Sequence, residues 1–200
     1  MNKQLIISIS REFGSGGHVI AEQLAKRFNL PLYDNNLLQE IAEKKNLAAE
    51  SLEKYDEVPK NKFFSRKVMG FSNSPEENIA NIQFDYMRQK ADEGESFVIV
   101  GRCSEEILRD YNGVVAIFIL GNAECKTKRI MEKYNLGKSD AQALMRKKDR
   151  KRRLYHNYYC KTKWGDSRNY DLSVNSSKLG IDKTVDILVD YINECVNLSD

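Results

Sequence analysis

The most constraining stretch of the chain is a strand that runs directly into a glycine-rich turn and a helix. Residues 4–10, "QLIISIS", are mostly apolar and β-branched, which is typical of a buried strand. The glycine-rich residues 14–17 follow the strand. Ile20, Leu24 and Phe28 then recur at the spacing of one helical face. Strand, tight turn and helix in this order predict the first unit of an α/β fold.

Four further stretches predict the remaining strands. Residues 97–101 ("FVIVG") and 114–120 ("VVAIFIL") are nearly all apolar, as expected of strands that helices cover on both faces. Two weaker candidates are residues 30–34 ("LPLYD") and 170–175 ("YDLSVN"). Because helical patterns separate these strands, the sequence predicts a doubly wound α/β sheet with right-handed crossovers.

Capping residues mark the ends of several helices between the strands. Ser74 followed by Pro75 begins one helix. Another is predicted over residues 123–137, and Ser139 starts the next. Residues 46–73 break this rhythm because they are charged and have no sustained period. We interpret them as an insertion over the sheet edge.

Length and composition favour one compact domain, since the chain has 200 residues and 41% of them are hydrophobic. No apolar run is long enough to cross a bilayer, and the initial "MNKQLIISIS" turns polar too early for a secretory signal peptide. We therefore expect a cytoplasmic protein without a membrane partner. Four cysteines that form no CxxC pair, with only two histidines, predict reduced thiols rather than a metal cage.

The glycine-rich turn has the composition of an anion site. Backbone N–H groups at the start of a helix converge on one point, where the helix dipole also favours negative charge, so phosphate is the natural occupant. Gly14, Gly16 and Gly17 allow close approach of the main chain, and Ser15 adds a hydroxyl group. The glycines could instead simply form a tight turn, but their position directly after the first strand favours phosphate binding.

This turn departs from the common phosphate-loop pattern GxxxxGK[ST]. When Gly16 is taken as the last glycine, Arg11 replaces the first glycine. In the same register Gly17 replaces the lysine, and His18 replaces the hydroxyl residue. The register shifted by one residue fits less well. Because the usual lysine spans the β- and γ-phosphates, another cation has to replace it, and Arg11 is the first candidate. His18 either donates to a phosphate oxygen or packs on the surface.

Several segments resemble the cytidylate kinase-like family of P-loop proteins, nearly end to end. They are "SISREFGSGGHVIAEQLAKRFNLPLYD", "VIVGRC" and "KWGDSRNYDLSVNSS", with the basic helix between the last two. The resemblance implies a three-layer α/β/α domain with a five-stranded parallel sheet, in which residues 46–95 form an acceptor-binding insertion and residues 138–168 a helical lid. It also implies in-line phosphoryl transfer from ATP, with Mg²⁺, to a small acceptor such as CMP.

The lid implied by the resemblance carries the basic segment "RKKDRKRR", residues 146–153. Arg152 matches the family's lid arginines best, and Arg150 and Arg153 are further catalytic candidates. Asp149 shares a helical face with two of these arginines and could hold one of them in an i, i+3 or i, i+4 pair. We expect these cations to offset the charge of the missing lysine.

Asp34 and Arg102 each follow a predicted strand, at the carboxyl edge where ligands of open α/β sheets bind. The resemblance implies an acceptor-site role for Asp34 and an acceptor-phosphate contact for Arg102. The alternatives are a helix N-cap for Asp34 and a structural ion pair for Arg102. Lys163 and Asp166, which follow the lid helix, are further candidates for substrate binding. The acceptor's identity and the residue that anchors magnesium stay open.

Two other functions also stay open. A loop without its lysine could bind a nucleotide without turnover, as a sensing module. Residues 146–163 combine basic and aromatic side chains and could contact nucleic acid, but a net charge of +3 argues against that partner. The sequence is compatible with a homo-oligomer.

Overall fold

The computed structural model describes residues 4–34, 37–45, 67–68, 71–72 and 75–197 of the chain. Its main sheet has five parallel strands in the order β2-β5-β1-β6-β7. The strands are β1 Ile6–Arg11, β2 Leu32–Tyr33, β5 Phe97–Val100, β6 Val114–Leu120 and β7 Leu172–Asn175. Each of the five predicted segments contributes one strand, so the predicted parallel sheet is confirmed.

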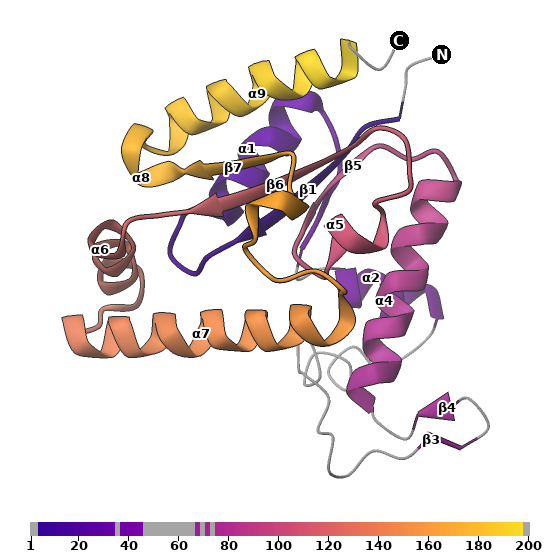
Figure 1. Cartoon of the computed structure of the whole chain (residues 1–200), viewed down its shortest axis with the longest axis horizontal. Coiled ribbons are helices and arrows are strands. Elements are labelled where there is room, and N and C mark those ends of the chain that lie inside the picture. Colours follow the sequence, from indigo (N-terminus) through magenta and orange to yellow (C-terminus); the bar gives the residue numbers. More distant parts are fainter. Residues whose placement is uncertain (1–3, 35–36, 46–66, 69–70, 73–74, 198–200) are drawn as a thin grey trace.

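Helices connect these strands and cover both faces of the sheet (Figure 1). Their bounds are α1 Gly17–Phe28, α2 Leu37–Lys45, α4 Pro75–Asp92, α5 Ser104–Ile107, α6 Ala123–Tyr134, α7 Lys138–Tyr159, α8 Ser176–Leu179 and α9 Ile181–Asn197. Helices α1 and α9 contact each other on one face, and α7 lies on the opposite side of the molecule from α9. An antiparallel hairpin of β3 (Lys67–Val68) and β4 (Phe71–Ser72) precedes α4.

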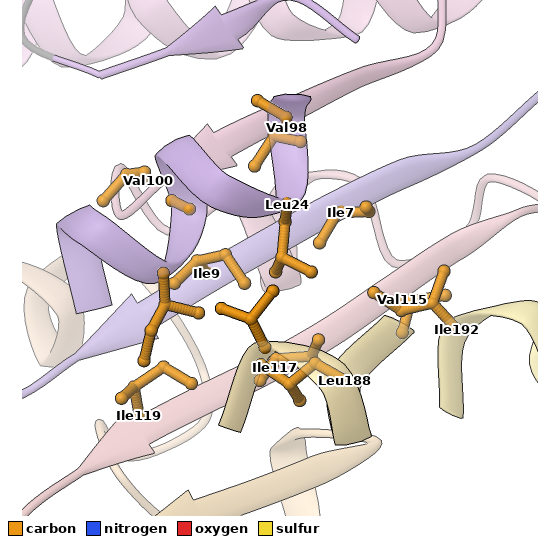
Figure 2. Close-up of a cluster of buried hydrophobic side chains, with 14 of the residues drawn as sticks. Ile7, Ile9, Leu24, Val98, Val100, Val115, Ile117, Ile119, Leu188 and Ile192 are labelled. Atoms are coloured by element: carbon orange, nitrogen blue, oxygen red, sulfur yellow. The ribbon is translucent and has the colours of Figure 1, made fainter. Parts of the chain in front are cut away.

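Apolar side chains fill the space on each side of the sheet, because successive residues of a strand point to opposite faces. On the side of α1 and α9, Ile7, Ile9 and Ile117 pack with Leu24 and Leu188, all completely buried (Figure 2). On the other side, residues of β5 pack with α2, α4 and α5. The predicted three-layer α/β/α architecture is therefore confirmed.

Strand β1 lies in the middle of the sheet and pairs with β5 and β6. Its register with β6 runs from Ile6 opposite Val114 to Arg11 opposite Ile119. The Glu12 N–H donates to the Ile119 carbonyl at 2.9 Å, which continues the pairing one residue beyond the strand. The glycine loop therefore starts from backbone that both neighbouring strands hold in place.

The helix ends follow the capping chemistry with small differences. Helix α4 begins at Pro75, as predicted, and α7 begins one residue before Ser139. Helix α6 ends at Tyr134 rather than near residue 137, because Asn135 adopts the left-handed conformation (φ 51°) that asparagine tolerates better than most residues. Since α7 continues to Tyr159, one long helix carries the whole basic cluster.

Most of the predicted insertion at residues 46–73 lies outside the described residues. The division into an acceptor-binding insertion (46–95) and a lid (138–168) stays a prediction. In the described ranges, no helix combines the length and the apolar character needed to span a membrane. All four cysteines are free thiols.

Candidate functional site

The glycine loop joins the carboxyl end of β1 to the first turn of α1. Gly16 caps α1 in the left-handed conformation (φ 84°), and the helix begins at Gly17. A Cβ atom at residue 16 would lie 2.3 Å from Cδ1 of Ile181, so both the conformation and the space require glycine here. The first N–H groups of a helix have no acceptor within it, and this is also the positive end of α1. The loop thus has the main-chain geometry of an anion site.

A cavity of about 530 Å³ lies over this loop. The predicted phosphate-binding residues Gly14, Gly16, Gly17 and His18 all line it. Two of its lining residues are acidic, Glu12 and Asp34, and six are basic: Arg11, Arg129, Lys133, Lys148, Lys151 and Arg152. The excess of positive charge favours a polyanionic ligand.

The side chain of Arg11 leaves no room for a side chain at residue 17. A Cβ atom added to Gly17 would lie 2.6 Å from Cβ and 3.0 Å from Cγ of Arg11. Arg11 itself is largely buried, with 11% of its side chain exposed, and it lines the cavity. Arg11 therefore occupies the space that the Cβ atom of the usual lysine at residue 17 would need.

The Asp34 carboxylate lies beside the loop and contacts two loop side chains. Its Oδ2 is 2.6 Å from Nδ1 of His18, and its Oδ1 is 4.0 Å from Nη2 of Arg11. Nε2 of His18 is also 3.3 Å from Glu22. At the start of α2, the Leu37 N–H donates to the backbone carbonyl of Asp34 at 3.1 Å. The Asp34 carboxylate is thus directed to the loop.

Helix α7 brings Asp149 and Arg152 to the loop from the other side. Nη1 of Arg152 donates to the Arg11 carbonyl at 3.1 Å, and its guanidinium lies 5.5 Å from the ring centre of Phe13. Oδ1 of Asp149 accepts the Phe13 N–H at 2.7 Å and lies 3.9 Å from Arg152. Burial raises the pKa of Asp149, although the Phe13 N–H and the charge of Arg152 oppose this shift. The contact between Asp149 and Arg152 has the i, i+3 spacing that the sequence suggested.

Helix α6 holds the loop through residues that the sequence analysis did not single out. Nζ of Lys126 donates to Oε2 of Glu12 at 2.8 Å, and the Gly121 N–H donates to the same oxygen at 3.1 Å. Arg129 donates to the Gly14 carbonyl. Lys126 and Arg129 are spaced i, i+3 on a helix that follows a strand of the sheet. This spacing places both side chains on one helix face, and it was the sequence pattern from which their contact with the loop could have been predicted.

Arg102 is 2% exposed and lies at the carboxyl end of β5. Its backbone adopts the left-handed conformation (φ 60°), as does that of Cys103 (φ 57°), which is uncommon for residues other than glycine. A second, small cavity is lined by Arg102 together with Arg11 and Arg152. Three arginines therefore meet where the two central strands β1 and β5 end.

Five of the predicted residues line neither cavity: Ser15, the exposed Arg150, Arg153 and Lys163, and Asp166. The Arg153 guanidinium lies 5.7 Å from the ring centre of Trp164. Asp166 accepts hydrogen bonds from Arg168, which lower its pKa to about 2. The structure thus brings Arg152, but not Arg150 or Arg153, to the phosphate loop.

Ser15 is buried and uses its hydroxyl group within the loop. Its Oγ donates to the Glu12 carbonyl at 2.8 Å, and Oγ of Ser176 donates to the Ser15 carbonyl at 2.5 Å. Among the residues with described positions, no group of three or more His, Cys, Asp or Glu side chains could hold a metal ion. Magnesium in kinase sites is usually held by one or two carboxylates together with substrate phosphates and water, which such a group need not provide.

The family model for the cytidylate kinase-like family matches residues 6–178, a range that contains all five strands, the glycine loop and α7. The chain belongs to the cytidylate kinase-like family. The resemblance noted from the sequence is therefore confirmed, and membership of the cytidylate kinase-like family supports phosphoryl transfer of the nucleotide-kinase type.

Three proteins illustrate what this cytidylate kinase-like chain is similar to. A cytidylate kinase of Pyrobaculum islandicum is 26% identical over 190 residues, which cover 94% of this chain and 92% of the relative. A crystal structure of an uncharacterized protein from Eubacterium ventriosum has a TM-score of 0.76 and 41% identity, and the match covers 95% of this chain and 99% of that one. Shikimate kinase of Bacteroides thetaiotaomicron shares the fold, with a TM-score of 0.55, 13% identity and coverage of 94% and 98%.

Proposed function

We propose that this protein transfers the γ-phosphoryl group of ATP to a small acceptor, with nucleoside monophosphates such as CMP the first class to test. The observation that carries the proposal is the placement of Arg11. Its side chain lines the cavity over the loop and occupies the space that the Cβ atom of a lysine at residue 17 would need. A cation thus remains at the phosphate loop although residue 17 is glycine.

The proposed step is an in-line displacement. An acceptor oxygen forms a bond to the γ-phosphorus while the bond from phosphorus to the bridging oxygen breaks, and ADP leaves with that oxygen. The loop N–H groups bind the donor phosphates, and Arg11 and Arg152 neutralise the negative charge on the transferred group. Both arginines line the cavity and are linked by the hydrogen bond from Arg152 to the Arg11 carbonyl. Magnesium, bound with the nucleotide, would neutralise further phosphate charge.

Asp34 and Arg102 are the proposed acceptor-binding residues. Support for them is their position at the carboxyl edge of the sheet, next to Arg11. Residues 46–95 are proposed to complete the acceptor site and residues 138–168 to act as the lid. For Lys163 and Asp166 the support is limited to their position after α7.

A phosphoryl-transfer screen tests the proposal directly. The full chain is incubated with MgATP and each of a set of nucleoside monophosphates and nucleosides, and ADP formation and the phosphorylated product are both measured. We expect acceptor-dependent ADP formation with at least one monophosphate. Tight MgATP binding without transfer to any acceptor would instead identify a sensing module and refute the kinase proposal.

Arginine-to-alanine variants connect the activity to the site. R11A is expected to weaken MgATP binding and to lower turnover, because it removes the cation beside the loop. Arg27 provides the matched control, since it lies exposed near the end of α1 and pairs with Asp186 at 3.1 Å. An R11A variant with unchanged turnover would remove Arg11 from the mechanism.

A further inference from the structure

Glu105 is a buried carboxylate to which three separate parts of the chain donate hydrogen bonds. It belongs to α5, directly after β5, and is 4% exposed. Its Oε2 accepts from Oγ of Ser10 at 3.2 Å, and its Oε1 accepts from Nε2 of His156 at 2.7 Å and from the Tyr170 hydroxyl at 3.3 Å. One side chain thus connects the end of β1, the last turns of α7 and the segment before β7.

The charges in this network compensate one another. Burial alone would lower the pKa of His156, but hydrogen bonds with Cys160 and Glu105 and the charge of Glu105 raise it to about 10. Burial and the same carboxylate raise the pKa of Tyr170 above its usual range. The network therefore places the His156 ring and two hydroxyl groups around the Glu105 side chain, and the raised pKa of His156 favours its charged form beside that carboxylate.

The network lies one helical turn from the contacts between α7 and the phosphate loop. His156 follows Arg152 by four residues, so the two side chains project from the same face of α7. Arg152 donates to the Arg11 carbonyl, and Asp149, three residues earlier, accepts the Phe13 N–H. The contact between His156 and Glu105 therefore joins α7 to the end of β1 through the same helix face, one turn from the residues that contact the loop.

We propose that Glu105 is a positioning residue: by binding His156 it fixes α7 against the end of β1 and so holds Arg152 and Asp149 on the phosphate loop. Glu105 lines neither cavity, so it acts through α7 rather than by touching a substrate. The catalytic value of this positioning rests on the proposed function, whereas the positioning itself is a property of the ligand-free protein.

Amide hydrogen exchange on the ligand-free full chain, measured by NMR, tests the positioning. In E105Q the Phe13 amide is expected to exchange about tenfold faster, because α7 opens locally and Asp149 no longer accepts its hydrogen bond. The neighbouring Glu12 amide donates to Ile119 within the sheet and is expected to keep its rate. Unchanged exchange at Phe13, or equal acceleration of both amides, would overturn the proposal.

Two further variants keep the test specific. E106Q removes the adjacent carboxylate, which contacts Arg109 at 3.5 Å and Thr162 at 3.2 Å, and it is expected to leave both amides unchanged. H156Q keeps an N–H donor for Glu105 and is expected to accelerate exchange at Phe13 less than H156A does. These two His156 variants also test the proposal if E105Q does not fold. Equal exchange rates of the Phe13 amide in H156Q and H156A would contradict it.

Calorimetric titration with MgATP separates this inference from the proposed function. If the unmodified protein does not bind MgATP but E105Q accelerates exchange of the Phe13 amide, the proposed function is refuted and the positioning role is supported. If the unmodified protein binds MgATP but E105Q does not change exchange of the Phe13 amide, the positioning role is refuted and the proposed function is supported. Where binding is measured, E105Q is expected to weaken it in the wild-type background and to have a smaller effect in R152A, because part of the effect of Glu105 acts through Arg152.

Discussion

Replacing Gly17 by lysine restores the usual phosphate-loop residue but places its Cβ against Arg11. The two Cβ atoms would lie 2.6 Å apart. Because the backbone fixes the position of a Cβ atom, neither can rotate away, and β1 or α1 has to shift. Overpacking of this kind costs about 1–3 kcal/mol, so we expect G17K to lower the free energy of unfolding by that amount.

Removing the Arg11 side chain in the same protein relieves the clash. In R11G/G17K the nearest remaining atom to the new Cβ is Cβ of Ile119 at 3.4 Å, which is a tolerable contact. A double-mutant cycle is therefore expected to give a coupling of about 1–3 kcal/mol between the two substitutions. R11G alone is expected to lower kcat by about 10²–10³-fold, as typical for loss of one preorganised charged or polar group, and the lysine of the double variant is expected to restore most of it.

Urea denaturation followed by circular dichroism measures the stabilities, and ADP formation with MgATP and a monophosphate measures kcat. G137K is the matched control, because Gly137 also lies at the start of a helix, as the N-cap of α7, but has its nearest neighbour at 3.8 Å. The reasoning is refuted if G17K is as stable as the unmodified protein, if the two substitutions show no coupling, or if R11G/G17K turns over no faster than R11G.

Three further predictions concern the lid, the buried histidine and the core. R152A is expected to lower kcat by at least about tenfold while R150A leaves it nearly unchanged, since only Arg152 lines the cavity; initial-rate measurements on the two variants check this. The raised pKa of His156 stabilises the fold fully below about pH 6.5, and this contribution is lost as the pH rises towards about 10. Urea midpoints across that range should therefore fall more steeply for the unmodified protein than for H156Q. L24A is expected to cost about 2–5 kcal/mol in urea unfolding, because Leu24 is completely buried between α1 and the sheet.

The sheet and the glycine loop could be predicted because their determinants are local. Apolar runs such as residues 114–120 are buried on both faces whatever surrounds them, and a glycine cluster between strand and helix allows few conformations. The positions of Arg11 and Asp34 beside the loop were also predictable, because each follows a parallel strand at the carboxyl edge of the sheet.

The contacts around the loop could not be predicted, because they join residues far apart in the chain. Glu12 meets Lys126 across 114 positions, and Ser10 meets Glu105 across 95. The charge pattern of the basic segment did not show which arginine faces the loop, since α7 carries positive charge on several sides. Only the family resemblance favoured Arg152. That choice follows from the packing of Tyr155 and His156, both buried one turn further along the helix.

The exclusion between residues 11 and 17 bears on how such proteins are recognised. Residues 11 and 17 are six positions apart in the sequence, but their side chains would begin in the same space beside the turn between β1 and α1. The sequence pattern GxxxxGK does not match this chain. A structural criterion does match it, because the side chain of Arg11 lines the cavity over the turn.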